Sequence, residues 1–318
     1  MKAAVVVGID HYSHAPLLGC VEDANSIAHV LDRHHDGSKN FSVKLLLSSR
    51  SAVTRPTLRE NVERVMGGSF DVALFYFAGH GIINSAGGCI VTQDAARYDE
   101  GISMSDILAL ANRSPSREVI IILDCCHSGA FGAVPAIDSP LSHLREGVSV
   151  LCASRSTESA AEVDGRGVFT GLVVEALYGG ASDLLGRITI ADVFAFVDRH
   201  LGPWEQRPLF KCHVSQLVPL RSTNPRIGVS ALHRLPEVFA TPDSDYPLDP
   251  SYESYEIDHA VSDRHREEVY NLIRAYRSVG LVCAATEQDL YLTAMSGGSC
   301  RLTKLGQYYW HLVKKHRV

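Results

Sequence analysis

The strongest constraint on the fold is a regular alternation of short apolar runs with longer amphipathic segments over the first two-thirds of the chain. Two runs, Asp71–Phe77 and Glu118–Leu123, are almost continuously apolar, as is typical of strands covered on both faces. Further strands are expected at Ala3–Ile9, Ser42–Leu47, Val148–Ala153 and Cys212–Val218. Helices with a 3.6-residue apolar period are expected at Val21–Arg33, Thr57–Met66, Ser103–Ala111, Val168–Leu177 and Thr189–His200. This order predicts the α/β class, with a mainly parallel sheet flanked by helices.

A length of 318 residues is enough for about two domains. We expect residues 1–221 to form the α/β domain. Residues 222–258 contain five prolines and several acidic residues, which favours a linker or a surface arm. Residues 259–318 are expected to form a small winged-helix-like domain. Its predicted elements are helices at Asp263–Val279, Glu287–Met295 and Leu305–Lys315 and a short strand at Cys300–Thr303.

The composition excludes several classes of protein. The chain has 30 Lys and Arg against 36 Asp and Glu, a mildly acidic balance that is unsuited to general nucleic-acid coating. No apolar run approaches the ~18–20 residues of a membrane helix, so no membrane partner is expected. The opening MKAAVVVGIDHY lacks the long hydrophobic region and cleavage site of a signal peptide. We therefore expect a cytoplasmic protein whose eight cysteines, which include no CxxC pair, are reduced.

Two of the predicted strands run directly into residues that carry chemistry. One continues into Ala78-Gly79-His80-Gly81 and the other into Asp124-Cys125-Cys126-His127-Ser128-Gly129. Residues just beyond the carboxyl ends of neighbouring parallel strands converge on one crevice. A histidine there can take the proton of a cysteine thiol, and the N–H that follows the histidine can point at a developing oxyanion. The pattern predicts a nucleophile–base pair.

These two motifs resemble those of the caspase superfamily of cysteine peptidases, in particular its metacaspase-like and prokaryotic caspase-like branch. A Gly-His-Gly segment is followed, 46 residues later, by Asp-x-Cys-His-Ser-Gly. Further similar segments appear in the family's order: Val6–Asp10, Leu18–Ala24, Gly167–Thr170 and Gln206–Pro208. The resemblance covers about residues 1–220. It implies a caspase-like fold and a cysteine endopeptidase that acts on proteins or peptides.

The resemblance also implies a role for each site residue. Cys126 is expected to be the nucleophile and His80 the general base and acid, with the N–H groups of Gly81 and Cys126 as the oxyanion hole. Asp23 and Asp124 are expected to form an acidic S1 pocket for the arginine or lysine before the cut bond, since a carboxylate can bind a guanidinium bidentately. The plainer alternatives make Asp23 a favourable charge in the first turn of a helix and Asp124 a strand-end turn residue.

Two departures from the family pattern limit the analogy. Ala78 stands two residues before His80, where metacaspases often have serine, so one polar contact of the pocket is expected to be missing. Many metacaspases also bind Ca²⁺ through a paired Asp-Asp in the segment that corresponds to residues 102–106, whereas this chain has only the isolated Asp94 and Asp106 nearby. Because Ca²⁺ takes six or more oxygen ligands, we expect activity without calcium and no metal or other cofactor.

Cys125 occupies the variable position of the cysteine motif and is expected to pack in the core. A metal site in segment 125–127, or at His11, His14 and Cys20, is a weaker interpretation. Adjacent residues of an extended chain point apart, and the ligand spacing of zinc motifs is absent.

Residues 130–147 form a long, weakly patterned segment in which Arg145 is the one Lys or Arg. Caspase-like enzymes are commonly controlled by cleavage in such loops. We therefore expect a zymogen-like enzyme that is processed near Arg145, by itself or by an upstream activating protease. The alternative is an ordinary surface loop. The family further suggests a regulated effector of a prokaryotic defence or cell-death pathway.

The C-terminal segment 264–318 carries nine Lys and Arg against four acidic residues. This balance suits nucleic acid, but docking of an adaptor or another protein partner is the favoured interpretation. A second functional hypothesis follows, in which the chain is a catalytically silent caspase-like scaffold whose C-terminal domain binds a protein partner or DNA. The presence of both His80 and Cys126 argues against that scaffold.

Overall fold

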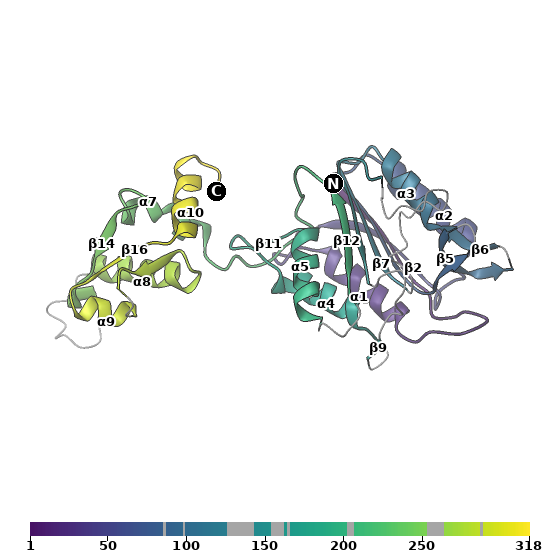
Figure 1. Cartoon of the computed structure of the whole chain (residues 1–318), viewed down its shortest axis with the longest axis horizontal. Helices are drawn as coiled ribbons and strands as arrows, with labels where there is room; N and C mark the ends of the chain where they lie inside the picture. Colours follow the sequence, from purple (N-terminus) through teal and green to yellow (C-terminus); the bar gives the residue numbers. More distant parts are fainter. Residues whose placement is uncertain are drawn as a thin grey trace. The chain divides into compact units, whose positions relative to one another are not determined.

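The chain folds into two compact units in the computed structural model (Figure 1). The structure describes residues 1–84, 87–97, 99–125, 143–153, 162–163, 166–201, 207–252, 264–286 and 289–318. The first unit comprises Met1–Ser182 and Gly186–Asn224, and the second comprises Asp183–Leu185 and Pro225–Val318. Each unit is described by itself.

A six-stranded sheet forms the centre of the first unit, in the order β12-β8-β7-β3-β1-β2. Its strands are β1 (Lys2–Gly8), β2 (Phe41–Leu47), β3 (Val72–Ala78), β7 (Glu118–Asp124), β8 (Val148–Cys152) and β12 (Leu209–His213). All neighbours pair in parallel except β12, which runs antiparallel to β8. The predicted α/β class with a mainly parallel sheet is confirmed. The last strand begins earlier than predicted, because Leu209 rather than Cys212 pairs with the end of β8.

Helices cover both faces of this sheet (Figure 1). One face packs against α1 (Cys20–Asp32), α4 (Val168–Glu175) and α5 (Ile190–His200), and the other against α2 (Arg55–Gly67) and α3 (Met104–Arg113). The β3 side chains alternate accordingly: Leu74 and Tyr76 belong to the first core, and Phe75 and Phe77 to the second. The continuous apolar run of β3 thus reflects burial on both faces.

A second, three-stranded antiparallel sheet follows directly after β3 and was not predicted. It consists of β4 (Gly81–Asn84), β5 (Gly87–Ala96) and β6 (Asp99–Ser103). Two short antiparallel pairs complete the unit: β9 (Glu162–Val163) with β10 (Arg166–Gly167), and β11 (Arg187–Ile188) with β13 (Arg221–Ser222). A π-helical turn, Ala176–Gly180, extends α4.

The start of α1 depends on residues at the end of β1. Gly19, at the N-cap, offers no side chain, and the carboxylate of Asp10 instead accepts hydrogen bonds from the N–H groups of Cys20 (2.8 Å) and Val21 (3.2 Å). The helix and the strand approach closely at Gly8, where a Cβ atom would lie 2.2 Å from the carbonyl oxygen of Cys20. Strand β1 therefore fixes where α1 begins.

The second unit has its own core and its own small sheet. Its helices are α6 (Val229–His233), α7 (Leu235–Val238), α8 (Arg264–Ser278), α9 (Leu290–Met295) and α10 (Lys304–Lys314), with a 3₁₀ turn at Pro250–Tyr252. Strands β14 (Asp245–Pro247), β16 (Ser299–Leu302) and β15 (Val282–Ala284) form an antiparallel sheet in that order. The predicted helices and strand of residues 263–315 are present within a few residues of their expected ends. The winged-helix-like arrangement stays a prediction.

The segment expected to be a linker differs from that expectation. Residues 225–252 belong to the second unit, and β14 in this segment pairs with β16. The Tyr276 hydroxyl donates to the Ala231 carbonyl (2.6 Å), and the Trp310 indole N–H donates to the Phe239 carbonyl (2.8 Å). Two of the prolines stand at positions that regular structure tolerates, because Pro236 lies in the first turn of α7 and Pro247 ends an edge strand. The rest of the expected linker, 253–258, lies outside the described residues.

The helices of the described parts of the chain are all too short or too polar to cross a membrane.

The contact at Gly8 gives a stability prediction. Gly8→Ala places a methyl group against the Cys20 carbonyl and should lower the free energy of unfolding by about 1–3 kcal/mol, measured by urea denaturation. Gly171→Ala is the control, because no atom lies within 4 Å of its Cβ position in α4. There, alanine should leave stability unchanged or raise it by up to about 1 kcal/mol. Equal stability of the two variants would contradict this account of the β1–α1 contact.

Candidate active site

The register of two neighbouring strands determines where the site lies. In the parallel pair of β3 and β7, Ala78 is opposite Asp124, and the Gly79 N–H donates to the Asp124 carbonyl (3.3 Å). His80 and Cys126 therefore follow strand ends that stop at the same level of the sheet. His80 is described by the structure, whereas Cys126 and the rest of segment 126–142 lie outside the described residues.

The backbone and ring of His80 are both held by neighbours. Its N–H donates to the Tyr12 hydroxyl (3.0 Å), and its carbonyl accepts from the Val91 N–H (2.9 Å). The Tyr12 and His80 rings pack with centroids 4.6 Å apart. The ring atom Nε2 lies 2.6 Å from the Ala15 carbonyl oxygen. Because a carbonyl can only accept, this contact requires a proton on Nε2 and leaves Nδ1 of the neutral ring with its lone pair.

The Tyr12 hydroxyl takes the place of one backbone hydrogen bond between His80 and Val91. This buried hydroxyl accepts from the His80 N–H and donates to the Val91 carbonyl (3.3 Å), so it bridges two backbone groups of facing strands. Burial raises the pKa of Tyr12 well above its ordinary value, which keeps this hydroxyl protonated and able to donate.

The structure also gives an orientation for the Gly81 N–H. Gly81 is opposite Ile90 in the antiparallel pair of β4 and β5, one position beyond the hydrogen bond from Val91 to His80. Opposed residues in such a ladder alternate between hydrogen-bonded and non-hydrogen-bonded pairs. Gly81 therefore falls on a non-hydrogen-bonded position, and its N–H is directed away from β5.

Asp23 and Asp124, which are far apart in the sequence, are brought together at Gly167. Both aspartates are buried, one in the first turn of α1 and the other at the end of β7. A Cβ atom on Gly167 would lie 2.6 Å from Oδ2 of Asp124 and 2.9 Å from Oδ2 of Asp23, so the two carboxylates are side by side. The Gly167 N–H donates to Asp23 Oδ2 (3.1 Å).

A relay of hydroxyl groups supports Asp124 from the core. The Thr170 hydroxyl donates to Asp124 Oδ2 (2.7 Å) and lies 2.6 Å from the Tyr76 hydroxyl. The pKa of Tyr76 is raised by burial and by the negative charges of Asp124 and Asp23, so its hydroxyl stays protonated. Since Thr170 uses its hydrogen on Asp124, Tyr76 donates to Thr170.

Several of these supporting residues were not assigned a role from the sequence. Gly167 and Thr170 were noticed as part of a motif, but a pattern does not show which atoms they contact. Ala15 contributes only its carbonyl, presented by a backbone with φ of 54°, and no side-chain pattern signals such a role. Tyr12 follows the first strand motif by two residues, which is the one signal that pointed to it.

Cys125 has the place expected of it. It is buried and belongs to the core between the sheet and α2 and α3, so its predicted packing role is confirmed.

Arg145 is anchored beside the first unit's core rather than extended from it. Its guanidinium donates to the carbonyls of Ser116 (2.7 Å), Ala111 (3.4 Å) and Glu146. Its backbone N–H donates to the Asn112 side chain (2.9 Å). Partial burial lowers the pKa of Arg145 from its ordinary value.

The isolated acids near β6 are occupied by neighbouring arginines. Asp94 accepts from the backbone N–H of Arg55 (2.8 Å), and Asp106 lies 3.7 Å from the Arg59 guanidinium. Within the described ranges, no three His, Cys, Asp or Glu residues are grouped so that they could hold a metal ion.

Comparison with known proteins gives a match over nearly all of the first unit. Residues 1–218 match the family model of the caspase domain. Curated proteins give no significant match. Among solved structures, protein GSU0716 from Geobacter sulfurreducens is similar with a TM-score of 0.53 and 14% sequence identity. The similarity covers 70% of this chain and 97% of that one, and at this identity it shows a shared fold alone.

The bridging role of Tyr12 predicts the effect of losing its hydroxyl. Tyr12→Phe leaves the His80 N–H and the Val91 carbonyl without this partner and should lower the free energy of unfolding by about 1–3 kcal/mol. The NMR signals of the His80 ring should shift as well. Tyr178→Phe, at a tyrosine 49% exposed, should change stability by no more than about 0.5 kcal/mol. If Tyr12→Phe is as stable as Tyr178→Phe, the bridging role of the Tyr12 hydroxyl is contradicted.

Proposed function

Because the chain belongs to the caspase domain family of cysteine peptidases, we propose that it is an endopeptidase that cuts protein or peptide substrates after arginine or lysine. The observation that supports this specificity is the pair of buried carboxylates, Asp23 and Asp124, side by side at Gly167. Two adjacent carboxylates suit a guanidinium or ammonium group, which they can bind bidentately and neutralise.

The covalent steps are assigned to His80 and Cys126. Nδ1 of His80 takes the thiol proton of Cys126, and the sulfur attacks the carbonyl carbon of the substrate. The imidazolium then gives that proton to the departing amine as the C–N bond breaks, which leaves a thioester. Water attacks the thioester, His80 takes its proton, and the carboxylic product leaves with the thiol restored.

Two features of the described residues support these steps. The hydrogen bond from Nε2 to the Ala15 carbonyl selects the ring tautomer that has its lone pair on Nδ1 and stabilises the imidazolium when it forms. The N–H of Gly81 is directed away from β5, and with the N–H of Cys126 it is assigned to the oxyanion of the tetrahedral intermediate. Asp124 precedes Cys126 by two residues, so the same strand end supplies both pocket and nucleophile.

We propose that the enzyme is zymogen-like and that cleavage near Arg145, by itself or by an upstream protease, activates it. A protease can hold Arg145 in its own pocket only after the guanidinium leaves the carbonyls of Ser116, Ala111 and Glu146. Processing is thus coupled to local opening of this segment. Arg145→Ala, followed by mass spectrometry of the chain, tests the position. The proposed setting is a cytoplasmic effector of a prokaryotic defence or cell-death pathway.

Peptide cleavage tests the proposed activity. Fluorogenic peptides ending in Arg, Lys or Asp are offered to wild type and to Cys126→Ala, with EDTA and with calcium. Turnover is expected after Arg and Lys, equally in both buffers, and should fall by about a thousandfold or more in the variant. Turnover after Asp would keep the peptidase and reject the acidic pocket. If nothing is cut even after limited treatment with an activating protease, the chain is a scaffold and the proposal is wrong.

The acid pair predicts a specificity defect at Gly167. Gly167→Ala pushes on both carboxylates and should lower kcat/KM for arginine substrates by about 10–100-fold. Gly171→Ala, one turn further along α4, has open space at its Cβ and should retain wild-type kinetics. An unchanged kcat/KM in Gly167→Ala would contradict the proposal that Asp23 and Asp124 bind the substrate.

A further inference from the structure

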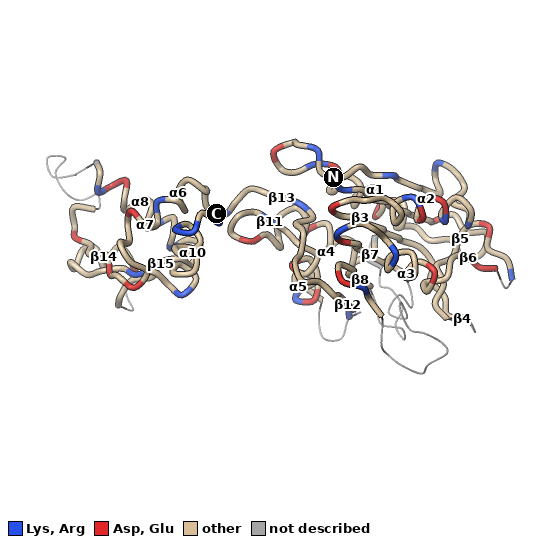
Figure 2. The backbone as a smooth tube through the Cα atoms, turned by 90° about the horizontal axis from the view of Figure 1, so that it is seen from above, with Lys and Arg blue, Asp and Glu red and all other residues tan. Residues whose placement is uncertain are grey.

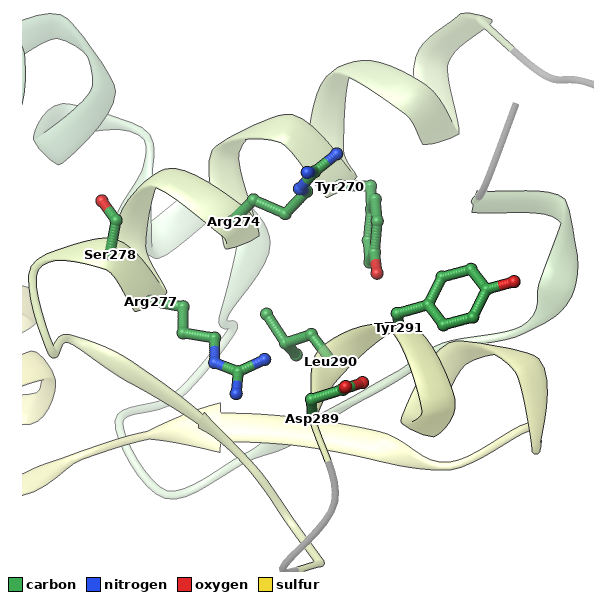
Figure 3. A pocket seen from close by; sticks show the side chains of 7 residues that line it. All are labelled: Tyr270, Arg274, Arg277, Ser278, Asp289, Leu290 and Tyr291. Carbon is green, nitrogen blue, oxygen red and sulfur yellow. The ribbon is translucent and has the colours of Figure 1, made fainter. Parts of the chain in front are cut away.

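The second unit contains a pocket of about 690 Å³ between α8 and the start of α9. Residues of α8 at one helical face line one side and residues of α9 the other, and Figure 3 shows their side chains around the opening: Tyr270, Arg274, Arg277, Ser278, Asp289, Leu290 and Tyr291. All of these described lining residues belong to the second unit.

Two arginines line the pocket without an ion pair to any described carboxylate. Arg274 and Arg277 lie one turn apart on α8, and neither guanidinium has a carboxylate within 4 Å among the described residues. By contrast, Arg234, Arg266 and Arg301 of the same unit each have such a partner. Like charges at this spacing repel each other and weaken a helix, so the pair costs stability in the absence of an anion.

The floor of the pocket is apolar and aromatic. Tyr270 and Leu290 are buried, at 2% and 3% exposed, whereas Tyr291 on the rim is 40% exposed. The Arg274 guanidinium lies over the Tyr270 ring, 6.0 Å from its centroid, and the two side chains are neighbours in Figure 3. A ligand therefore meets two guanidinium groups and the exposed Tyr291 ring above a buried apolar layer.

The charge pattern discriminates between classes of ligand. Two guanidinium groups bind carboxylates or phosphates. The Asp289 carboxylate, which accepts from the Leu292 N–H (2.7 Å) at the start of α9, also lies on the rim. Its repulsion grows with the number of negative charges on a ligand, so it disfavours a nucleic-acid strand more than a peptide with one or two carboxylates. A peptide, in contrast, combines one or two carboxylates with backbone N–H groups, from which Asp289 can accept hydrogen bonds.

Basic residues also lie outside the pocket, interspersed with acidic ones. Lys and Arg positions lie on α8 and on α10, as the charge-coloured backbone shows (Figure 2). Because Asp and Glu slightly outnumber Lys and Arg in the sequence of this unit, the attraction of an acidic partner comes from the arginines of the pocket and not from the unit as a whole.

We propose that this pocket is a docking site for an acidic peptide segment, with at least one Asp or Glu, of a partner protein. The carboxylate binds Arg274 and Arg277, and an adjoining apolar side chain packs against the exposed ring of Tyr291. This proposal gives the second unit a recruiting role that does not depend on which bond the first unit cuts.

Selection from a random peptide library tests the docking site. Phage-displayed dodecamers are selected on full-length Cys126→Ala protein, so that captured peptides are not cut, and affinities of the selected peptides are measured by fluorescence anisotropy. Enrichment of Asp and Glu is expected. Arg274→Gln/Arg277→Gln should weaken binding at least about tenfold. Lys315→Gln/Arg317→Gln removes the same charge from the same unit outside the pocket and should weaken it less than about threefold.

Three outcomes would overturn the proposal. They are selection without acidic enrichment, equal loss of affinity in the two double variants, and a twelve-nucleotide thymidine strand that binds more tightly than the selected peptides and depends on Arg274 and Arg277. Because the assay needs no catalysis, its failure is distinct from failure of the proposed peptidase.

Discussion

The pairing of β3 with β7 is the constraint on which the site depends. Ala78 and Asp124 are opposite each other, and the Gly79 N–H donates to the Asp124 carbonyl. A shift of this register by one residue would reverse the faces of a strand buried on both sides. The large side chains of β3 pack against helices on both faces of the sheet. By holding the register, they also determine where His80 lies relative to the end of β7.

A second constraint is the burial of two carboxylates beside one another. Such burial costs several kcal/mol per charge unless hydrogen bonds or a cation compensate it. The Gly167 N–H and the Thr170 hydroxyl supply part of that compensation from the start of α4, and Tyr76 supports Thr170 from β3. The acid pair is thus assembled by α1, β7 and α4 together. A substrate cation supplies the remaining compensation of these buried charges. The stability of the acid pair is thereby linked to the proposed specificity.

The sequence was most informative where physical periodicity or a chemical motif acts locally. Apolar runs predicted β3 and β7 because burial on both faces leaves no polar positions. The motifs at their ends indicated His80 and Asp124, and the segment Leu18–Ala24 indicated Asp23. The roles of Tyr12 and Ala15 were not predictable, since one bridges backbone groups and the other acts through a carbonyl. The prolines of residues 225–252 predict a linker, but two of them occupy a helix start and an edge strand, which are positions that proline tolerates.

The central claim is that the aligned strand ends present Cys126 to a substrate whose arginine is held by Asp23 and Asp124. Covalent labelling tests it most directly. The protein is treated with peptidyl chloromethyl ketones ending in arginine or aspartate, and the alkylated cysteine is identified by mass spectrometry. The account predicts that the arginine reagent alkylates Cys126 much faster than the aspartate reagent, with loss of chloride. Preference for the aspartate reagent, or no labelling by either when iodoacetamide reaches Cys126, would contradict it.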